Sequence, residues 1–256
     1  MTAGLTARAA GRQRRFRRSA ALALVLLAVL VLVAELLRPT DPPAAGIHPA
    51  AAVVRTSDPT TTWFCAAGTS QPGGAADETV VVANAGSQRG ERARVRISVL
   101  TGTDPAGVPI APAVRELSLA PAAEVRVRVA DLVASANPGV IVEGRGAPIV
   151  VSHLLRGNGD TAAGACARGG SDRWFFGGGS TVLGSNLTLW LFNPFPGDAV
   201  VDLSFATDTG NEAPNEFQGL VVPGRTRLAV ALDAGVRRRA VVAAEVRARR
   251  GRVVAE

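Results

Sequence analysis

The sequence has no lysine and no tyrosine, and it has only two histidines and two cysteines. The glycine run 177–179 is not followed by a lysine, which excludes a nucleotide-phosphate loop. Neither cysteine belongs to a CxxC motif or has a histidine close by in the sequence, so we predict no metal site and no cofactor. His153 follows Ser152 on an expected strand, where adjacent side chains point to opposite faces and cannot pair as base and nucleophile. We therefore expect no catalytic residues, and we expect His153 to be a packing or surface residue at a strand end.

The formal net charge of +7 is concentrated at the N-terminus. Residues 1–18 contain six arginines and no acidic residue, whereas acidic and basic residues nearly balance from residue 39 onward. A nucleic-acid-binding domain carries its basic residues on the folded surface. A cluster confined to a short tail gives no support for such a partner, and we predict none.

A long apolar run follows this arginine cluster. Residues 20–34 are all apolar or small, and an expected helix over 19–38 is long enough to span the lipid bilayer. Positively charged flanks stay in the cytoplasm, so we expect residues 1–18 inside the cell and the C-terminal region outside it. The arginines that fix this orientation are Arg12, Arg14, Arg15, Arg17 and Arg18. A cleaved signal peptide is the alternative, and it would export the same region.

A Pro- and Ala-rich linker over 39–60 leads from the anchor to a region with an internal repeat. Tryptophan and phenylalanine stand together at 63–64 and again at 174–175, and Asn84 and Asn193 each end an apolar run. Further runs match in the same order, with small differences in loop length. Chance explains single matches but not an ordered series, so we predict two copies of one unit.

Each copy has the pattern of a β-sandwich. Residues 92–99 and 125–129 alternate with period two, which is typical of a strand with one buried face. Glycine and proline recur roughly every 8–12 residues, as turns do in sandwiches. We therefore predict an all-β fold with two tandem immunoglobulin-like β-sandwich units, over 61–160 and 171–256, after one N-terminal transmembrane helix.

The two cysteines flank the first unit. Cys65 lies near its start, and Cys166 lies just before the start of the second unit. An exported region meets an oxidising compartment, which favours a disulfide between them. Two free buried thiols or an intermolecular bond are the alternatives.

This layout resembles an uncharacterised family of actinobacterial membrane-anchored envelope proteins, known only as a domain of unknown function with tandem W-F-C and W-F-x-G-G motifs. The residues that carry the resemblance are Trp63, Cys65, Asn84, Cys166, Trp174, Gly178, Asn193 and Pro194. The resemblance implies an envelope location but no activity, substrate or catalytic residue. Sequences of that family continue beyond the position of Glu256, which implies a second unit that is cut short there.

Arginines gather on two expected strands. The first strand places three on one face, namely Arg92, Arg94 and Arg96, and the strand over 125–129 carries two more. If these strands are neighbours, they form a basic stripe that contacts an anionic envelope polymer or lipid headgroups. The alternative is a solvated face whose arginines pair with Glu116 and Glu124.

Trp190 and Phe192 form a large aromatic pair on one face of an expected strand. The equivalent positions in the first unit hold the smaller Val81 and Ala83. We expect the aromatic pair to pack between the two units. An exposed surface for sugar stacking or protein docking is the alternative.

These observations predict a non-enzymatic, membrane-anchored extracytoplasmic protein of a bacterial envelope, with a structural or interaction role. A cell-wall glycan-binding module, or an accessory subunit for envelope polysaccharide assembly, is the second hypothesis. A hydrolase with an unrecognised site is the third.

Overall fold

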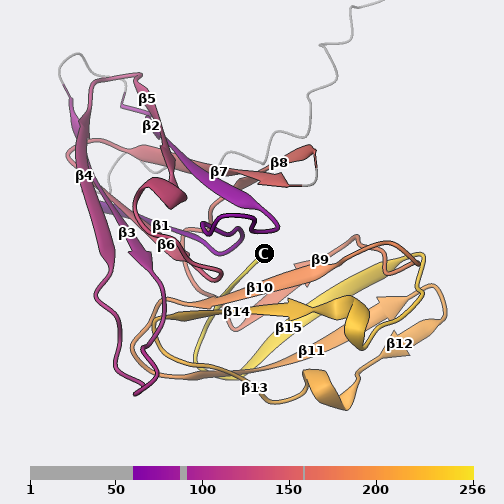
Figure 1. Cartoon of the computed structure of the whole chain (residues 1–256). Coiled ribbons are helices and arrows are strands. Elements are labelled where there is room, and N and C mark those ends of the chain that lie inside the picture. Colours follow the sequence, from indigo (N-terminus) through magenta and orange to yellow (C-terminus); the bar gives the residue numbers. More distant parts are fainter. Residues whose placement is uncertain (1–59, 87–90, 158) are drawn as a thin grey trace, which may run out of the picture. The chain divides into compact units, whose positions relative to one another are not determined.

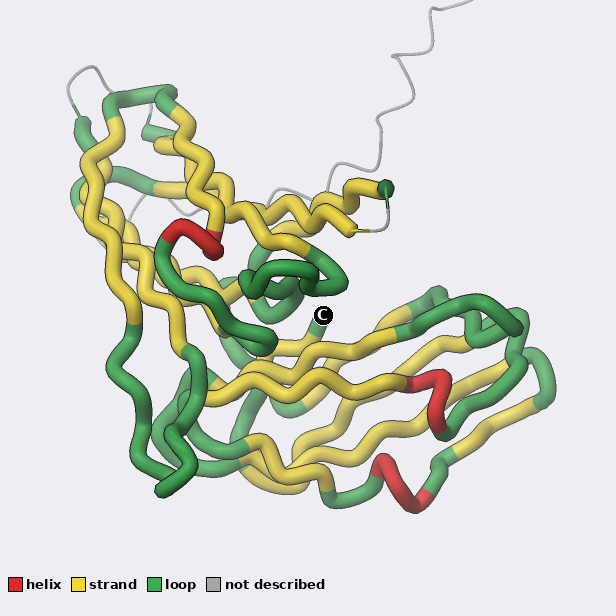
Figure 2. Tube along the Cα trace, viewed as in Figure 1, coloured by secondary structure: helices red, strands yellow, loops and turns green. Residues whose placement is uncertain are grey.

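The structure is a computed structural model that describes residues 60–86, 91–157 and 159–256, which all belong to one compact unit. The expected tail over 1–18, the anchor over 19–38 and the linker up to residue 59 lie outside the described residues. Among the described residues, no helix has both the length and the apolar character needed to cross a bilayer. Their fold is all-β, and the helical segments are three single 3₁₀ turns (Figure 2).

The first half forms two antiparallel four-stranded sheets. One sheet has the order β1-β6-β3-β4 and the other β5-β2-β7-β8 (Figure 1). The strands are β1 (Thr60–Cys65), β2 (Asp77–Asn84), β3 (Ala93–Leu100), β4 (Ala113–Leu119), β5 (Glu124–Arg128), β6 (Gly139–Arg145), β7 (Ile149–Gly157) and β8 (Asp160–Ala165). Strand β8 begins at Asp160, where the predicted first unit ends and the sequence pattern predicts no strand.

The second half also forms two sheets. One has the order β12-β11-β15-β9, with β13 also paired to β11, and the other has the order β14-β10-β16. The strands are β9 (Arg173–Phe176), β10 (Thr188–Asn193), β11 (Ala199–Thr207), β12 (Gly210–Glu212), β13 (Leu220–Val222), β14 (Thr226–Ala231), β15 (Val242–Arg250) and β16 (Val254–Ala255).

The pairing order is the same in both halves. The series β1-β6-β3 corresponds to β9-β15-β11, and β5-β2-β7 corresponds to β14-β10-β16. The side-chain amide of Asn84 donates to the carbonyls of Glu91 and Leu119, while its oxygen accepts from the amide of Gly86. Asn193 makes the equivalent bonds, to the carbonyls of Gly197 and Val222 and from the amide of Phe195. Each asparagine therefore ties the end of one strand to two segments of the facing side.

Alternation along the strands creates a core between the sheets of each half. In β2 the side chains of Val80 and Val82 are fully buried, and those of the intervening residues are half-buried. Trp63 and Ile97 join them in the first core, while Leu203 is fully buried in the second. The period-two pattern thus buries one side of each strand, as alternation requires.

Cys65 and Cys166 form the predicted disulfide, across a sequence separation of 101 residues. Both cysteines are buried in the first core. The adjacent residues Phe64 and Ala167 exchange two backbone hydrogen bonds, so the chain leaving the first half is paired with its first strand. Closing a loop of this length stabilises a fold by about 2–5 kcal/mol, largely through the entropy of the unfolded chain.

A third apolar cluster joins the two halves. Its fully buried members are Ala66 from the first half with Phe192 and Val254 from the second. Phe192 packs edge-to-face on Phe64, with ring centroids 6.5 Å apart. The last residue of the chain, Glu256, lies at this junction, between the two groups of strands (Figure 1).

Candidate functional site

The arginines of β3 stand on the outer face of the sheet β1-β6-β3-β4. Register places Arg94 directly opposite Arg145 of β6 on one side and Ser118 of β4 on the other. Both arginines are exposed, and neither guanidinium lies within 4.0 Å of a carboxylate of the described residues. Like charges on directly opposite residues repel each other. The row therefore carries an uncompensated pair of positive charges.

The next cross-strand row on the same face contains two glutamates and one arginine. Arg96 lies between Glu143 of β6 and Glu116 of β4, which are its cross-strand neighbours. Two residues along an antiparallel strand span about 7 Å, so this acidic row runs close beside the Arg94–Arg145 row. A cavity of about 500 Å³ is lined by both rows.

This cavity continues toward the second half. An adjoining hollow of about 360 Å³ shares Arg96 and Glu143 with it and is also lined by Pro194 and Arg225. We call the two hollows together the arginine groove. Its sides come from both halves of the chain, and its floor is the outer face of one sheet.

The predicted stripe is only partly formed. Arg92 is exposed, and it donates from Nε to Ser118 Oγ and from Nη2 to the Ser118 carbonyl. Arg126 and Arg128, however, lie on β5 in the other sheet, so the two arginine-bearing strands are not neighbours. The expectation of one stripe across both strands is wrong, because alternation defines the face of a strand but not the sheet to which it belongs.

One of the two expected acidic partners, Glu124, forms an ion pair with an arginine of β5, as the solvated-face alternative expects. Glu124 pairs with Arg126, at 2.9 Å, and Asp77 pairs with Arg128, at 3.0 Å. Both pairs are exposed and belong to the sheet β5-β2-β7-β8. Of the two expected partners, only Glu116 lies beside the arginines of β3.

The aromatic pair on β10 lies at the junction of the halves. Phe192 has no exposed surface, and its ring covers the backbone of Gly139 at the start of β6. Trp190 is half-buried, and the guanidinium of Arg227 lies 5.9 Å from its ring centroid. The side chain of Phe192 is therefore closed off from solvent.

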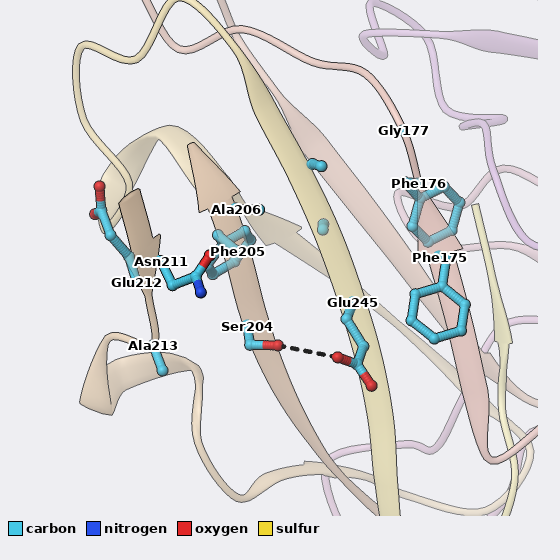
Figure 3. A pocket seen from close by; sticks show the side chains of 12 residues that line it. Phe175, Phe176, Gly177, Ser204, Phe205, Ala206, Asn211, Glu212, Ala213 and Glu245 are labelled. Atoms are coloured by element: carbon cyan, nitrogen blue, oxygen red, sulfur yellow. Dashed lines mark hydrogen bonds between the residues drawn. The ribbon is translucent and has the colours of Figure 1, made fainter. Parts of the chain in front are cut away.

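A different aromatic residue is exposed on the second half. Phe175 of β9 has an exposed fraction of 68%. It borders a hollow of about 520 Å³ with Glu245 and Ser204, which lie in the same cross-strand row (Figure 3). The hydroxyl of Ser204 donates to Glu245 over 3.5 Å, and Asn211 lies at the other side of the hollow. An open ring beside polar groups has the composition of a sugar-stacking surface.

A buried ionic cluster holds the junction together. His153 Nδ1 lies 3.1 Å from Glu78 Oε1, and His153 Nε2 lies 3.4 Å from Glu256 Oε2. The same oxygen of Glu256 accepts from the amides of Ala66 and Ala67, at 3.1 and 2.7 Å. The C-terminal residue of the second half is thus bound to β7 and to the loop after β1 in the first half.

Burial and pairing shift the pKa values of Glu78, His153 and Glu256. Complete burial raises the pKa of Glu78, and the hydrogen bond with His153 offsets this only in part. Burial also raises the pKa of Glu256. Burial by itself would lower the pKa of His153, but the bond with Glu78 and the charge of Glu256 outweigh it, and that pKa is raised. The cluster therefore retains protons to higher pH than its members would in water.

Arg227 of β14 adds a second polar link across the junction. Its guanidinium donates to the carbonyls of Ala66 and Ala136, at 2.8 and 2.9 Å. Burial lowers the pKa of Arg227 to about 10, so it stays charged at neutral pH. Its positive charge balances the carboxylates of Glu78 and Glu256.

Cys65, Cys166 and His153 also lie together, with their potential ligand atoms within 4.8 Å of one another. The sequence places no histidine near either cysteine, and pairing of β7 with β2 and β8 brings this one to them. The two sulfurs are bonded to each other, so neither is a thiolate that could bind a zinc ion.

The expectation that His153 is a simple packing or surface residue missed the ionic cluster. A sequence signal existed, because Glu78 is in phase with the buried Val80 and Val82, and His153 is in phase with Ile149 and Val151. A polar residue on the apolar phase of a strand needs a buried partner. The sequence did not indicate which partner, since 75 residues separate Glu78 from His153.

Comparison with known proteins gives limited similarity. Residues 150–256 match a family of unknown function, DUF5719, which fits the expected resemblance to an uncharacterised family over less than half of the chain. No curated protein sequence matches the chain. A crystal structure titled Thermotoga maritima 1070 aligns with a TM-score of 0.32 and 22% identity, covering 42% of this chain and 92% of that chain. Red sea bream transglutaminase aligns with a TM-score of 0.16 and 13% identity, covering 68% of this chain and 26% of that chain. TM-scores this low do not support any inference about function.

Proposed function

We propose that this chain is a non-enzymatic, membrane-anchored extracytoplasmic protein of an actinobacterial envelope, in which two tandem immunoglobulin-like units form an interaction platform. Residues 19–38 are its anchor in the lipid bilayer. The shared strand order and the equivalent bonds of Asn84 and Asn193 support the proposal of two copies of one unit.

The observation that carries the proposed role is the closed junction. A catalytic acid or base must reach its substrate. Glu78 is fully buried, and the side chain of His153 is only 4% exposed. These groups instead hold the two halves together with Phe192 and Arg227, which suits a rigid scaffold.

An extracytoplasmic location is supported by the disulfide, because such bonds persist in oxidising compartments and are rare in the cytosol. The arginine cluster before the apolar run of the N-terminus supports the same orientation.

Protease treatment of intact cells stripped of their wall tests this topology. The full chain carries an epitope tag after Glu256. Cleavage within the linker over 39–60 should release a tagged fragment without lysis, and that fragment should contain the Cys65–Cys166 bond by mass spectrometry under non-reducing conditions. A tag that is protected until the membrane is permeabilised would place the C-terminal region inside the cell and refute the proposal.

A glycan-binding module is the second candidate, and the open ring of Phe175 favours it. Full-length protein in detergent should bind to purified cell walls, and Phe175→Ala should bind less, since the variant lacks the exposed apolar ring on which a sugar would stack. Val221→Ala on β13, which pairs with β11 of the same sheet and not with β9, removes another exposed apolar side chain and is the matched control. Equal retention of both variants would exclude stacking at Phe175.

A further inference from the structure

We propose that the arginine groove binds an acidic polysaccharide of the envelope, with Arg94 and Arg145 holding its carboxylate groups. This inference rests on the proposed extracytoplasmic location, because such polymers lie outside the membrane. It assigns a ligand class and a site to the interaction platform.

The first step is the uncompensated charge of the Arg94–Arg145 row. Two guanidiniums on directly opposite residues repel each other unless an anion lies between them. Arginine presents a planar fork of donors that matches the two oxygens of a carboxylate. Elsewhere on this half, the exposed Arg126 and Arg128 have acidic partners of their own. The Arg94–Arg145 row differs from the next row in that no acidic residue lies opposite either arginine in register, so an external anion can supply the missing negative charge there.

The second step is the composition of the neighbouring row. Glu116 and Glu143 flank Arg96 there and offer carboxylate oxygens, which accept hydrogen bonds from hydroxyl groups. An acidic sugar carries a carboxylate and several hydroxyls within one ring. Its carboxylate can therefore bind the arginines of the first row while its hydroxyls donate to the glutamates of the second row. A uniformly anionic lipid surface would gain from the first row and be repelled by the second.

The third step is the shape of the site. The two hollows adjoin through Arg96 and Glu143, and the second reaches Arg225 in the other half. A groove that continues past one sugar-sized hollow suits a chain of sugars rather than a single small anion. The buried junction keeps both ends of this groove in fixed register.

Binding of polygalacturonate by the full chain in detergent tests the proposal, with neutral dextran, inorganic phosphate and anionic vesicles as comparison ligands. We expect polygalacturonate to bind in a salt-dependent manner and the three comparison ligands to bind much more weakly. The double variant Arg94→Gln/Arg145→Gln should lose about tenfold or more in affinity, which corresponds to about 1.4 kcal/mol.

The double variant Arg126→Gln/Arg128→Gln is the matched control, because it removes the same charge from exposed strand positions of the other sheet. It should bind polygalacturonate like the wild type. An equal loss in both double variants would show non-specific attraction and overturn the proposal. Stronger binding to vesicles than to polygalacturonate would assign the face to lipid and overturn it as well.

Glu143→Ala separates sugar recognition from charge attraction. Removal of a negative charge strengthens a purely electrostatic interaction with a polyanion. Recognition of sugar hydroxyls predicts a weaker interaction instead, and stronger binding of this variant would contradict the proposed ligand. If protease treatment places the region outside the cell but polygalacturonate does not bind, the proposed location stands and only this ligand assignment fails. Thermal melting of each variant confirms that it is folded.

Discussion

Replacing Gly139 by alanine should destabilise the chain through Phe192, although the two residues lie in different halves. A Cβ atom at position 139 would lie 2.4, 2.6 and 2.8 Å from three carbons of the Phe192 ring. The ring is fully buried and cannot swing into solvent. Overpacking of this kind costs about 1–3 kcal/mol. Phe192→Ala by itself should cost about 3–5 kcal/mol, since it leaves a cavity at the junction.

The double variant makes the prediction specific. Without the ring, the methyl group added at position 139 no longer meets the three carbons that crowd it, so Gly139→Ala should cost almost nothing in the Phe192→Ala background. The double variant should therefore cost less than the sum of the two single variants by about 1–3 kcal/mol, which is the overpacking cost that disappears with the ring. Urea unfolding of the four proteins, followed by tryptophan fluorescence at one pH, measures this coupling.

Gly178→Ala is the control for the chemical change itself, because nothing lies within 4 Å of a Cβ atom at that position. Its effect should be small and should add to that of Phe192→Ala. If Gly139→Ala costs the same with and without the ring, the packing of Phe192 across the junction is refuted.

Three further predictions concern the disulfide, the ionic cluster and the repeated asparagines. Replacing Cys65 and Cys166 by alanine should lower the free energy of unfolding by about 2–5 kcal/mol, and reduction should then have no further effect on the urea midpoint. The raised pKa of His153 means that its stabilising contribution is complete below its unfolded value of about 6.5 and is lost as the pH rises through its folded value. Urea unfolding from pH 6 to 9 should therefore show a steeper loss of stability in the wild type than in His153→Gln, and parallel curves would contradict this. Asn84→Ala and Asn193→Ala should each cost about 1–3 kcal/mol, because each removes one buried and one part-buried hydrogen bond to a backbone carbonyl, and clearly unequal losses would count against equivalent roles.

The buried ionic cluster explains why stability should decline toward alkaline pH. Folding takes Glu78, His153 and Glu256 out of water, and the directions of their pKa shifts all favour the protonated forms. Breaking one member leaves the others buried without a full set of partners, which costs more than the pair contributes. The atoms Glu78 Oε2 and Glu256 Oε1 already lack hydrogen-bond partners within the described residues. A retained proton lowers the cost of burying them.

Local patterns in the sequence were sufficient to predict the all-β class, the disulfide and many of the strands, although not β8. Alternation with period two specifies which side of a strand is apolar, and it needs no knowledge of distant residues. The position of the two cysteines at the ends of one unit likewise indicates that they can meet. Orientation in the membrane remains a prediction from the arginines of residues 1–18, which lie outside the described residues.

Tertiary structure alone decided which strands are neighbours and in what register. No local pattern indicates that Arg94 lies opposite Arg145, that β5 belongs to the other sheet, or that His153 lies between Glu78 and Glu256. The physical reason is that a strand's own sequence determines its faces, whereas its partners are chosen by the packing of all strands together. The arginine groove and the closed junction are therefore properties of the assembled sheets, built from residues that the sequence keeps far apart.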